Sequence, residues 1–384
     1  MSIVRRLALV ALLALLSLGR AHANPMLLVD MDTLEVLYAQ EAGQPWHPAS
    51  LTKMMSAYVT FEEIAKGNMT LDTPVVLSKK AAGQAPSKTS LPAGSGLTLK
   101  DALYIMVVKS ANDVSMAIAE TVGGSEAGFV AKMNDAAARM GLTATHFTNP
   151  NGLHDPDQYT SARDLAVLAL YIRQSFPQYL PLFGTDVVRL GKANLESNNS
   201  LLTSFAGTTG MKTGFVCASG LNMVATVERN GRNLMAIVLG GSSARERNER
   251  AAELILRGFS GAVRSTGQQV LTLANNPGVP PVDMRAQICG KEAKTYVAAQ
   301  EAAFPMGLTG QPSYLNDVVP PRSYVATDLG RIAVGVSLPR PRPAHLPQFA
   351  APVSAEAVAG DLRPSLAAAA TNAAPFPRPR PNNL

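Results

Sequence analysis

A serine and a lysine three residues apart, Ser50 and Lys53, have the types and spacing that could do covalent chemistry. A serine hydroxyl is a weak nucleophile and needs a nearby base. Apolar residues recur at helical spacing from Leu51 to Ile64, so Lys53 would share a helix face with Ser50. Burial there would lower the pKa of Lys53 and make a neutral amine accessible. Taken alone, this S-x-x-K tetrad is more typical of a serine helix cap followed by a solvated lysine.

A second short motif, Ser110-Ala111-Asn112, lies at a break between two helical patterns. A loop at this break could direct both polar side chains into a cleft. A hydroxyl can relay a proton there, and an amide can hold a lysine or a substrate carbonyl. The alternative is an ordinary Ser/Asn helix cap, which is the more typical use of such a triplet.

A third motif, Lys212-Thr213-Gly214, begins an expected edge strand. Lysine and threonine can bind a substrate carboxylate, and glycine lets a substrate backbone approach closely. The backbone N–H groups of Ser50 and Phe215 are the natural donors for an oxyanion. The alternative is a surface lysine on a strand.

The three motifs, in this order, resemble the set shared by β-lactamases and penicillin-binding proteins. Longer segments make the resemblance specific. Over about residues 25–260 the chain resembles the D-alanyl-D-alanine carboxypeptidases, the low-molecular-weight serine-type penicillin-binding proteins of peptidase family S11. The segments that carry this resemblance are residues 47–53, 149–153, 161–166 and 210–215.

The resemblance implies a two-step acyl transfer on a peptidoglycan stem pentapeptide. Ser50 would attack the carbonyl of the penultimate D-Ala while Lys53 takes its proton. Ser110 would pass a proton to the leaving D-Ala, and water would then hydrolyse the acyl-enzyme. The implied process is peptidoglycan biosynthesis, which maintains the cell wall and cell shape.

The resemblance also implies which residues bind the substrate. Asn112 would orient the substrate or the lysine base, and Lys212 and Thr213 would bind the terminal carboxylate beside Gly214 and Phe215. β-Lactam antibiotics, which mimic D-Ala-D-Ala, would acylate the serine as covalent inhibitors. No cofactor and no metal are implied.

The elements that must position these motifs form an α+β pattern, with strands at both ends and helices between them. We therefore expect a DD-peptidase/β-lactamase-like fold, in which N- and C-terminal strands join one antiparallel sheet and helices pack on it. An Asn230-Gly231 pair between two β-rich segments predicts a hairpin. The expected strands are 26–30, 34–38, 221–229 and 232–239, and the expected helices are 51–64, 98–109, 113–122, 125–141, 161–174 and 244–259.

The chain divides into four expected regions. Residues 1–23 have the basic, apolar and small-residue segments of a cleavable export signal, and the apolar run is too short for a comfortable membrane span. The catalytic domain covers 24–262, and a small divergent region covers 263–338. Residues 339–384 hold ten prolines and are expected to be disordered. The processed protein should be periplasmic or in the cell envelope, without a firm membrane anchor.

The charge distribution argues against a nucleic-acid partner. The chain carries a net charge of +6, of which the leader and the Pro/Arg-rich tail contribute +3 each. Residues 24–338 are therefore neutral, whereas a nucleic-acid-binding domain should itself be basic.

Export also makes a disulfide possible between the two cysteines, Cys217 and Cys289. Two buried free thiols are the alternative, because sequence does not reveal whether two cysteines are close in space.

Three other functions remain open at the level of sequence. A β-lactamase needs a base for the deacylating water, but Ala111 replaces the aspartate of S-D-N and no E-x-x-L-N string occurs. A DD-endopeptidase or transpeptidase would share the same acyl-enzyme. A non-catalytic peptidoglycan-binding protein is the alternative from a different class.

Overall fold

The computed structural model describes residues 23–263, 265–276 and 278–332. The expected leader, apart from Ala23, and the expected tail from residue 339 lie outside this part of the chain. Within the described ranges, no helix is long and apolar enough to cross a membrane.

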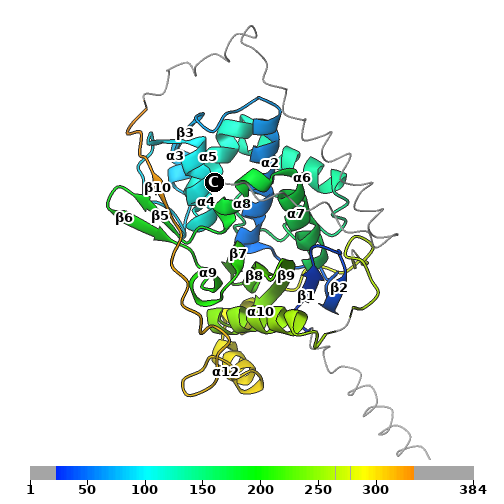
Figure 1. Cartoon of the computed structure of the whole chain (residues 1–384). Coiled ribbons are helices and arrows are strands. Elements are labelled where there is room, and N and C mark those ends of the chain that lie inside the picture. Colours follow the sequence, from blue (N-terminus) through cyan, green and yellow to red (C-terminus); the bar gives the residue numbers. More distant parts are fainter. Residues whose placement is uncertain (1–22, 264, 277, 333–384) are drawn as a thin grey trace, which may run out of the picture.

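A five-stranded antiparallel sheet forms the centre of the molecule, in the order β2-β1-β9-β8-β7 (Figure 1). Two strands come from the N-terminus and three from residues 208–241, so the expected sheet of N- and C-terminal strands is confirmed. Asn230 and Gly231 form the hairpin turn, and both have positive φ, as a type I′ turn requires. The strands are β1 (Met26–Asp30), β2 (Val36–Gln40), β7 (Thr208–Val216), β8 (Gly220–Arg229) and β9 (Arg232–Gly241).

Helices cover both faces of this sheet (Figure 1). On one face, α2 is buried along most of its length, and four further helices surround it. The other face is covered by α10 (Ala244–Phe259), which agrees with the expected closing helix. The helices on the first face are α2 (Thr52–Ala65), α4 (Leu99–Val108), α5 (Asn112–Gly123), α6 (Glu126–Arg139) and α7 (Ala162–Ser175).

Two apolar cores hold these layers together. The larger lies between the sheet and the bundle around α2, and the smaller lies between the sheet and α10. Alternation along β9 explains the division, because Met235 and Ile237 enter the first core while Leu234 and Ala236 enter the second.

Serine and threonine side chains fix where the helices begin. Thr98 accepts a hydrogen bond from the Asp101 backbone N–H at the start of α4, and Ser161 does the same for Asp164 at the start of α7. Both helices therefore begin within one residue of the starts expected from sequence, 98 and 161.

Shorter elements complete the fold. They are the 3₁₀ helices η1 (Ala49–Leu51) and η2 (Pro177–Tyr179), the helices α3 (Lys79–Ala82), α8 (Leu180–Phe183), α9 (Leu201–Ser204), α11 (Arg285–Ile288) and α12 (Ala293–Ala303), and the strands β3 (Pro74–Val76), β4 (Gly96–Thr98), β5 (Val187–Leu190), β6 (Ala193–Glu196) and β10 (Ser323–Ala326).

The stretch from 265 to 332 runs around the main unit, below α10 in Figure 1 and then up to β5. Val282 forms a β-bridge to Trp46, and β10 pairs in parallel with β5. Tyr324 in β10 stacks on Tyr104 of α4 and donates a hydrogen bond to Asp101. These contacts join the stretch to the loop before Ser50 and to the helix before Ser110.

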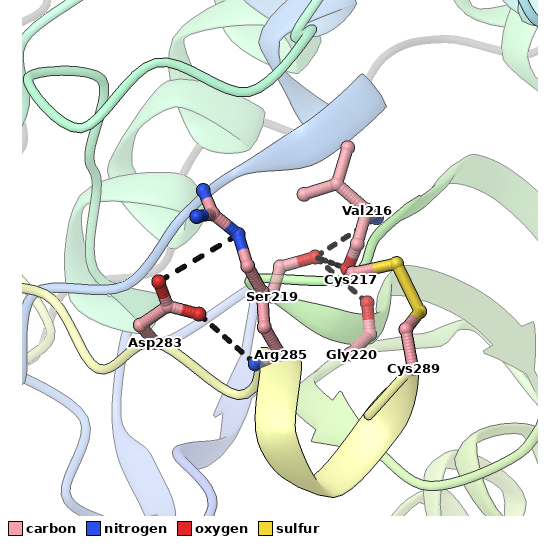
Figure 2. The surroundings of a disulfide bond; sticks show 7 residues. All are labelled: Val216, Cys217, Ser219, Gly220, Asp283, Arg285 and Cys289. Atoms are coloured by element: carbon pink, nitrogen blue, oxygen red, sulfur yellow. Dashed lines mark hydrogen bonds and ion pairs between the residues drawn. A yellow bond between two sulfur atoms is a disulfide. The ribbon is translucent and has the colours of Figure 1, made fainter. Parts of the chain in front are cut away.

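A disulfide bond between Cys217 and Cys289 fastens this stretch to the end of β7 (Figure 2). Cys217 follows the last residue of β7, and Cys289 follows the last residue of α11. A backbone hydrogen bond from Met284 N–H to the Ala218 carbonyl supports the same junction. The cross-link closes a separation of 72 residues.

We expect the double substitution C217S/C289S to lower the free energy of unfolding by up to about 4 kcal/mol, because the unfolded chain gains the entropy of an open loop. Thermal unfolding with and without a thiol reductant measures the effect. Reductant should lower the Tm of the wild-type protein and leave that of the double variant unchanged. An equal Tm for oxidised and fully reduced wild-type protein would contradict the expectation.

Candidate active site

Ser50 lies in the 3₁₀ turn η1, directly before α2. The preceding residue, Ala49, has a φ of 50°, a left-handed conformation that costs free energy in a non-glycine residue. The surrounding structure holds this turn in place, since the Asn222 side chain donates hydrogen bonds to the carbonyls of His47 and Pro48 at 2.9 and 3.3 Å. The backbone that presents Ser50 is therefore fixed by tertiary contacts.

Lys53 is completely buried one turn further along α2. Its Nζ atom donates hydrogen bonds to Ser50 Oγ at 3.0 Å, to Asn112 Oδ1 at 2.7 Å and to the Asn151 carbonyl. Burial lowers the pKa of Lys53 well below its usual value, and the nearby charge of Lys212 lowers it further. The amine is thus placed and poised to take the proton of the serine hydroxyl.

The Ser110-Ala111-Asn112 triplet connects α4 to α5 and does not cap α5 through its side chains. Ala111 occupies the N-cap position, and Ser110 has a φ of 62°. The Asn112 backbone N–H is held by the Ser87 carbonyl at 2.7 Å, and its side chain also donates to the Ala85 carbonyl. The strained loop therefore directs the Asn112 amide toward Lys53.

The third motif lies in β7, the edge strand of the sheet, which begins four residues before Lys212. Lys212 is buried, and its Nζ donates to Ser110 Oγ and to the Thr213 carbonyl, both at 3.0 Å. Burial lowers the pKa of Lys212 to about 7, and the cation of Arg247 contributes to this lowering. A carboxylate bound beside this amine would favour its charged form.

Gly214 explains how closely β7 approaches the serine. A Cβ atom at this position would lie 2.9 Å from the backbone nitrogen of Ser50 and 3.0 Å from the Pro48 carbonyl oxygen. A side chain would therefore push the strand away from the nucleophile. Phe215 follows with a side chain that is 51% exposed.

The structure thus brings the three motifs together from distant parts of the chain. Asn112 joins the second motif to Lys53, and Ser110 joins it to Lys212. A serine beside a buried amine, with a second buried cation close by, can support acyl transfer and can bind an anionic substrate group. Among the described residues, no group of three or more His, Cys, Asp or Glu side chains could hold a metal ion.

Sequence reasoning missed three residues that contact or influence this site. The Asn151 carbonyl contacts Lys53, and Gly152, with a φ of 84°, packs its backbone against Ala49. The Asn-Pro-Asn-Gly run predicts a turn but does not say what the turn touches. Arg247 is buried in α10, where an amphipathic pattern predicts only a solvated charge, and burial lowers its pKa to about 10.

Comparison with known proteins identifies the family. The sequence model of the D-alanyl-D-alanine carboxypeptidase family, Peptidase_S11, matches residues 16–243. The chain therefore belongs to this family of peptidases.

Individual relatives agree with this assignment. The chain is 33% identical over 246 residues to the D-alanyl-D-alanine carboxypeptidase DacF of Bacillus subtilis, a match that covers 62% of this chain and 63% of that protein. It resembles crystal structures of penicillin binding protein 5 from Haemophilus influenzae, with 30% identity and a TM-score of 0.59 over 62% of this chain and 71% of that one. Penicillin-binding protein D2 from Listeria monocytogenes, in a cefotaxime-bound form, is 29% identical with a TM-score of 0.57, over 62% of this chain and 97% of that one.

The burial of Lys212 should make stability depend on pH. In the folded protein the pKa of Lys212 is about 7, against a usual 10.5. Between these values the unfolded chain binds one more proton, so the stability of the wild-type protein rises with pH across this window. A Lys212→Met variant lacks this contribution and should have a higher free energy of unfolding than the wild-type protein at pH 7. We expect this difference to shrink from pH 7 to pH 10 by up to about 1.4 kcal/mol per pH unit.

Denaturant unfolding at several pH values measures this difference. Lys79→Met, which removes an exposed lysine, is the control and should follow the wild-type curve. Parallel stability curves for the wild-type protein and Lys212→Met would contradict the expectation.

Proposed function

We propose that this protein is a serine-type D-Ala-D-Ala carboxypeptidase that removes the terminal D-Ala from peptidoglycan stem pentapeptides. The observation that carries the proposal is the 3.0 Å approach of Lys53 Nζ to Ser50 Oγ, with the lysine wholly buried. Family membership supports it, and the chain spans 63% of the length of the B. subtilis relative that bears this name.

In the acylation step, Lys53 takes the Ser50 proton as Oγ attacks the carbonyl carbon of the penultimate D-Ala. The backbone N–H groups of Ser50 and Phe215 receive the developing oxyanion, since Gly214 lets β7 lie against Ser50. The peptide C–N bond then breaks, and the leaving D-Ala nitrogen takes a proton through Ser110. The Lys212–Ser110 hydrogen bond supports this role because it holds the hydroxyl beside a buried amine.

Lys212 and Thr213 bind the terminal carboxylate of the substrate. A partly neutral Lys212 in the empty site becomes fully charged when a carboxylate arrives, because the anion favours the ammonium form. Asn112 holds Lys53 in position through its side-chain oxygen. Substrate binding thus increases the positive charge on Lys212, which strengthens its attraction for the substrate carboxylate.

Water completes the reaction by hydrolysing the ester on Ser50. β-Lactams react with the same serine and block it as covalent inhibitors. The cefotaxime-bound structure of the Listeria penicillin-binding protein supports this part of the proposal. An endopeptidase or transpeptidase would use the same ester and would differ only in its leaving group or acceptor.

The same proposal places the protein outside the cytoplasm, in the periplasm or cell envelope. The expected leader and the Cys217–Cys289 disulfide support export. The neutral charge of residues 24–338 supports action without nucleic acid.

We expect Ser50→Ala to reduce D-Ala release from a synthetic pentapeptide by at least about four orders of magnitude, because no nucleophile remains. Labelling by fluorescent penicillin should disappear with it. The measurement is D-Ala release together with gel fluorescence on folded protein. Labelling that persists on another serine would refute the assignment.

We expect Lys53→Ala to slow penicillin acylation by about 10²–10⁴-fold while the fold is kept, because the hydroxyl loses its base. Stopped-flow or quenched labelling measures the second-order acylation rate constant. Lys66→Ala, at the end of the same helix, is the control and should react at the wild-type rate. A near-normal rate for Lys53→Ala would remove this lysine as the base.

A further inference from the structure

A segment beyond the match to the family model lies at the far end of the β7 edge. That match ends at residue 243, whereas the segment covers 282–289. Val282 bridges to Trp46, Met284 N–H donates to the Ala218 carbonyl at 3.0 Å, and Cys289 is bonded to Cys217. The segment is thus fixed at three points beside the turn that follows β7.

This inference rests on the proposed function, which fixes the direction in which the bound peptide extends away from Ser50. Its carboxylate lies at Lys212, and its reactive carbonyl lies at Ser50 beside Gly214. The upstream part of the peptide then continues along the exposed edge of β7 toward Cys217, as an added antiparallel strand would. At about 3.3 Å per residue, the positions two and three residues before the terminal D-Ala reach the turn that the 282–289 segment covers.

The segment carries two charged side chains beside this turn, Arg285 and Asp283. Arg285, the first residue of α11, is 52% exposed in its side chain, and its Nε lies 3.7 Å from Asp283 Oδ2. Figure 2 shows both side chains on the side of α11 away from Cys289. At 3.7 Å and half exposed, this ion pair is weak and leaves most of the guanidinium donors free.

The charge of Arg285 also reaches His154, in the loop that packs against the residues before Ser50. Burial lowers the pKa of the His154 imidazole, and the charges of His47 and Arg285 lower it further, while Asp283 and Asp155 act in the opposite direction. His154 packs edge-on against His47, three residues before the serine, with ring centroids 4.8 Å apart. The charges of the segment therefore act on a residue that contacts the turn before Ser50.

We propose that Arg285 forms a subsite for a carboxylate on the donor peptide, located two or three residues upstream of the terminal D-Ala. A guanidinium offers paired N–H donors that match a carboxylate. Asp283 orients the segment through its hydrogen bond from the Arg285 backbone N–H at 2.9 Å and competes weakly for the guanidinium. The disulfide holds this arrangement at a fixed distance from β7.

The test compares four synthetic substrates that share the D-Ala-D-Ala end. Apart from the terminal D-Ala carboxylate, one pentapeptide carries a free carboxylate only on its second residue, a glutamate, and another only on its third residue, a diaminopimelate. A third pentapeptide has both of these upstream groups amidated. The fourth is diacetyl-lysyl-D-Ala-D-Ala, which ends at the position two residues upstream and has no upstream carboxylate. The two carboxylate-bearing peptides distinguish the possible sources of the anion.

We expect Arg285→Ala to lower kcat/KM about fivefold for at least one carboxylate-bearing pentapeptide, through KM, and to leave the amidated and the short substrates unchanged. Arg285→Lys should recover part of the loss. Asp283→Asn should raise kcat/KM for the same peptide, because the guanidinium loses its competitor, and added salt should reduce the difference. Lys291→Ala, an exposed lysine of the same stretch, is the matched control and should have no effect.

Equal kinetics of Arg285→Ala and the wild-type protein on all four substrates would overturn the subsite, as would an equal loss on all four. If Arg285→Ala fails to fold, Asp283→Asn decides, because unchanged selectivity in that variant contradicts the proposal. Failure of the wild-type protein to release D-Ala from every substrate is a different result, and it would instead contradict the proposed function.

Discussion

The burial of one lysine amine is the constraint on which the rest of this structure depends. Lys53 has no contact with solvent, and it finds hydrogen-bond acceptors on the serine, on Asn112 and on the Asn151 carbonyl. A buried cation is costly, so its pKa falls and a neutral base becomes available beside the hydroxyl. The second lysine, Lys212, lowers the pKa of Lys53 further, and its own burial lowers the free energy of unfolding.

Backbone geometry supplies the precision that this arrangement needs. Ala49 and Ser110 both adopt left-handed conformations, and the structure keeps them there because packed loops and side-chain hydrogen bonds surround them. Gly152 lets the 149–153 loop pack closely against the turn at Ala49 and Ser50, and Gly214 lets β7 approach the same turn. The edge position of β7 leaves one side of that strand free for an extended peptide.

Short sequence patterns predicted the features that depend on neighbouring residues in the chain. Helical spacing placed Lys53 one turn from Ser50, and the Asn-Gly pair located the hairpin whose strands complete the sheet. Tertiary contacts decide the rest, so the sequence could not reveal that the Asn151 carbonyl contacts Lys53 or that Arg247 is buried. The 263–338 stretch was expected as a small divergent region, and the sequence could not reveal that its described part packs along the main unit through β10 and a disulfide.

Mass spectrometry of the wild-type protein after treatment with penicillin is the most direct test of the central claim, that Ser50 is the nucleophile activated by the buried lysine. Intact mass reports the number of adducts, and peptide mapping reports their position. The account predicts one stable adduct per chain, on Ser50, forming faster as pH rises through the lowered pKa of Lys53. No adduct on folded protein, or an adduct on another residue, would contradict it.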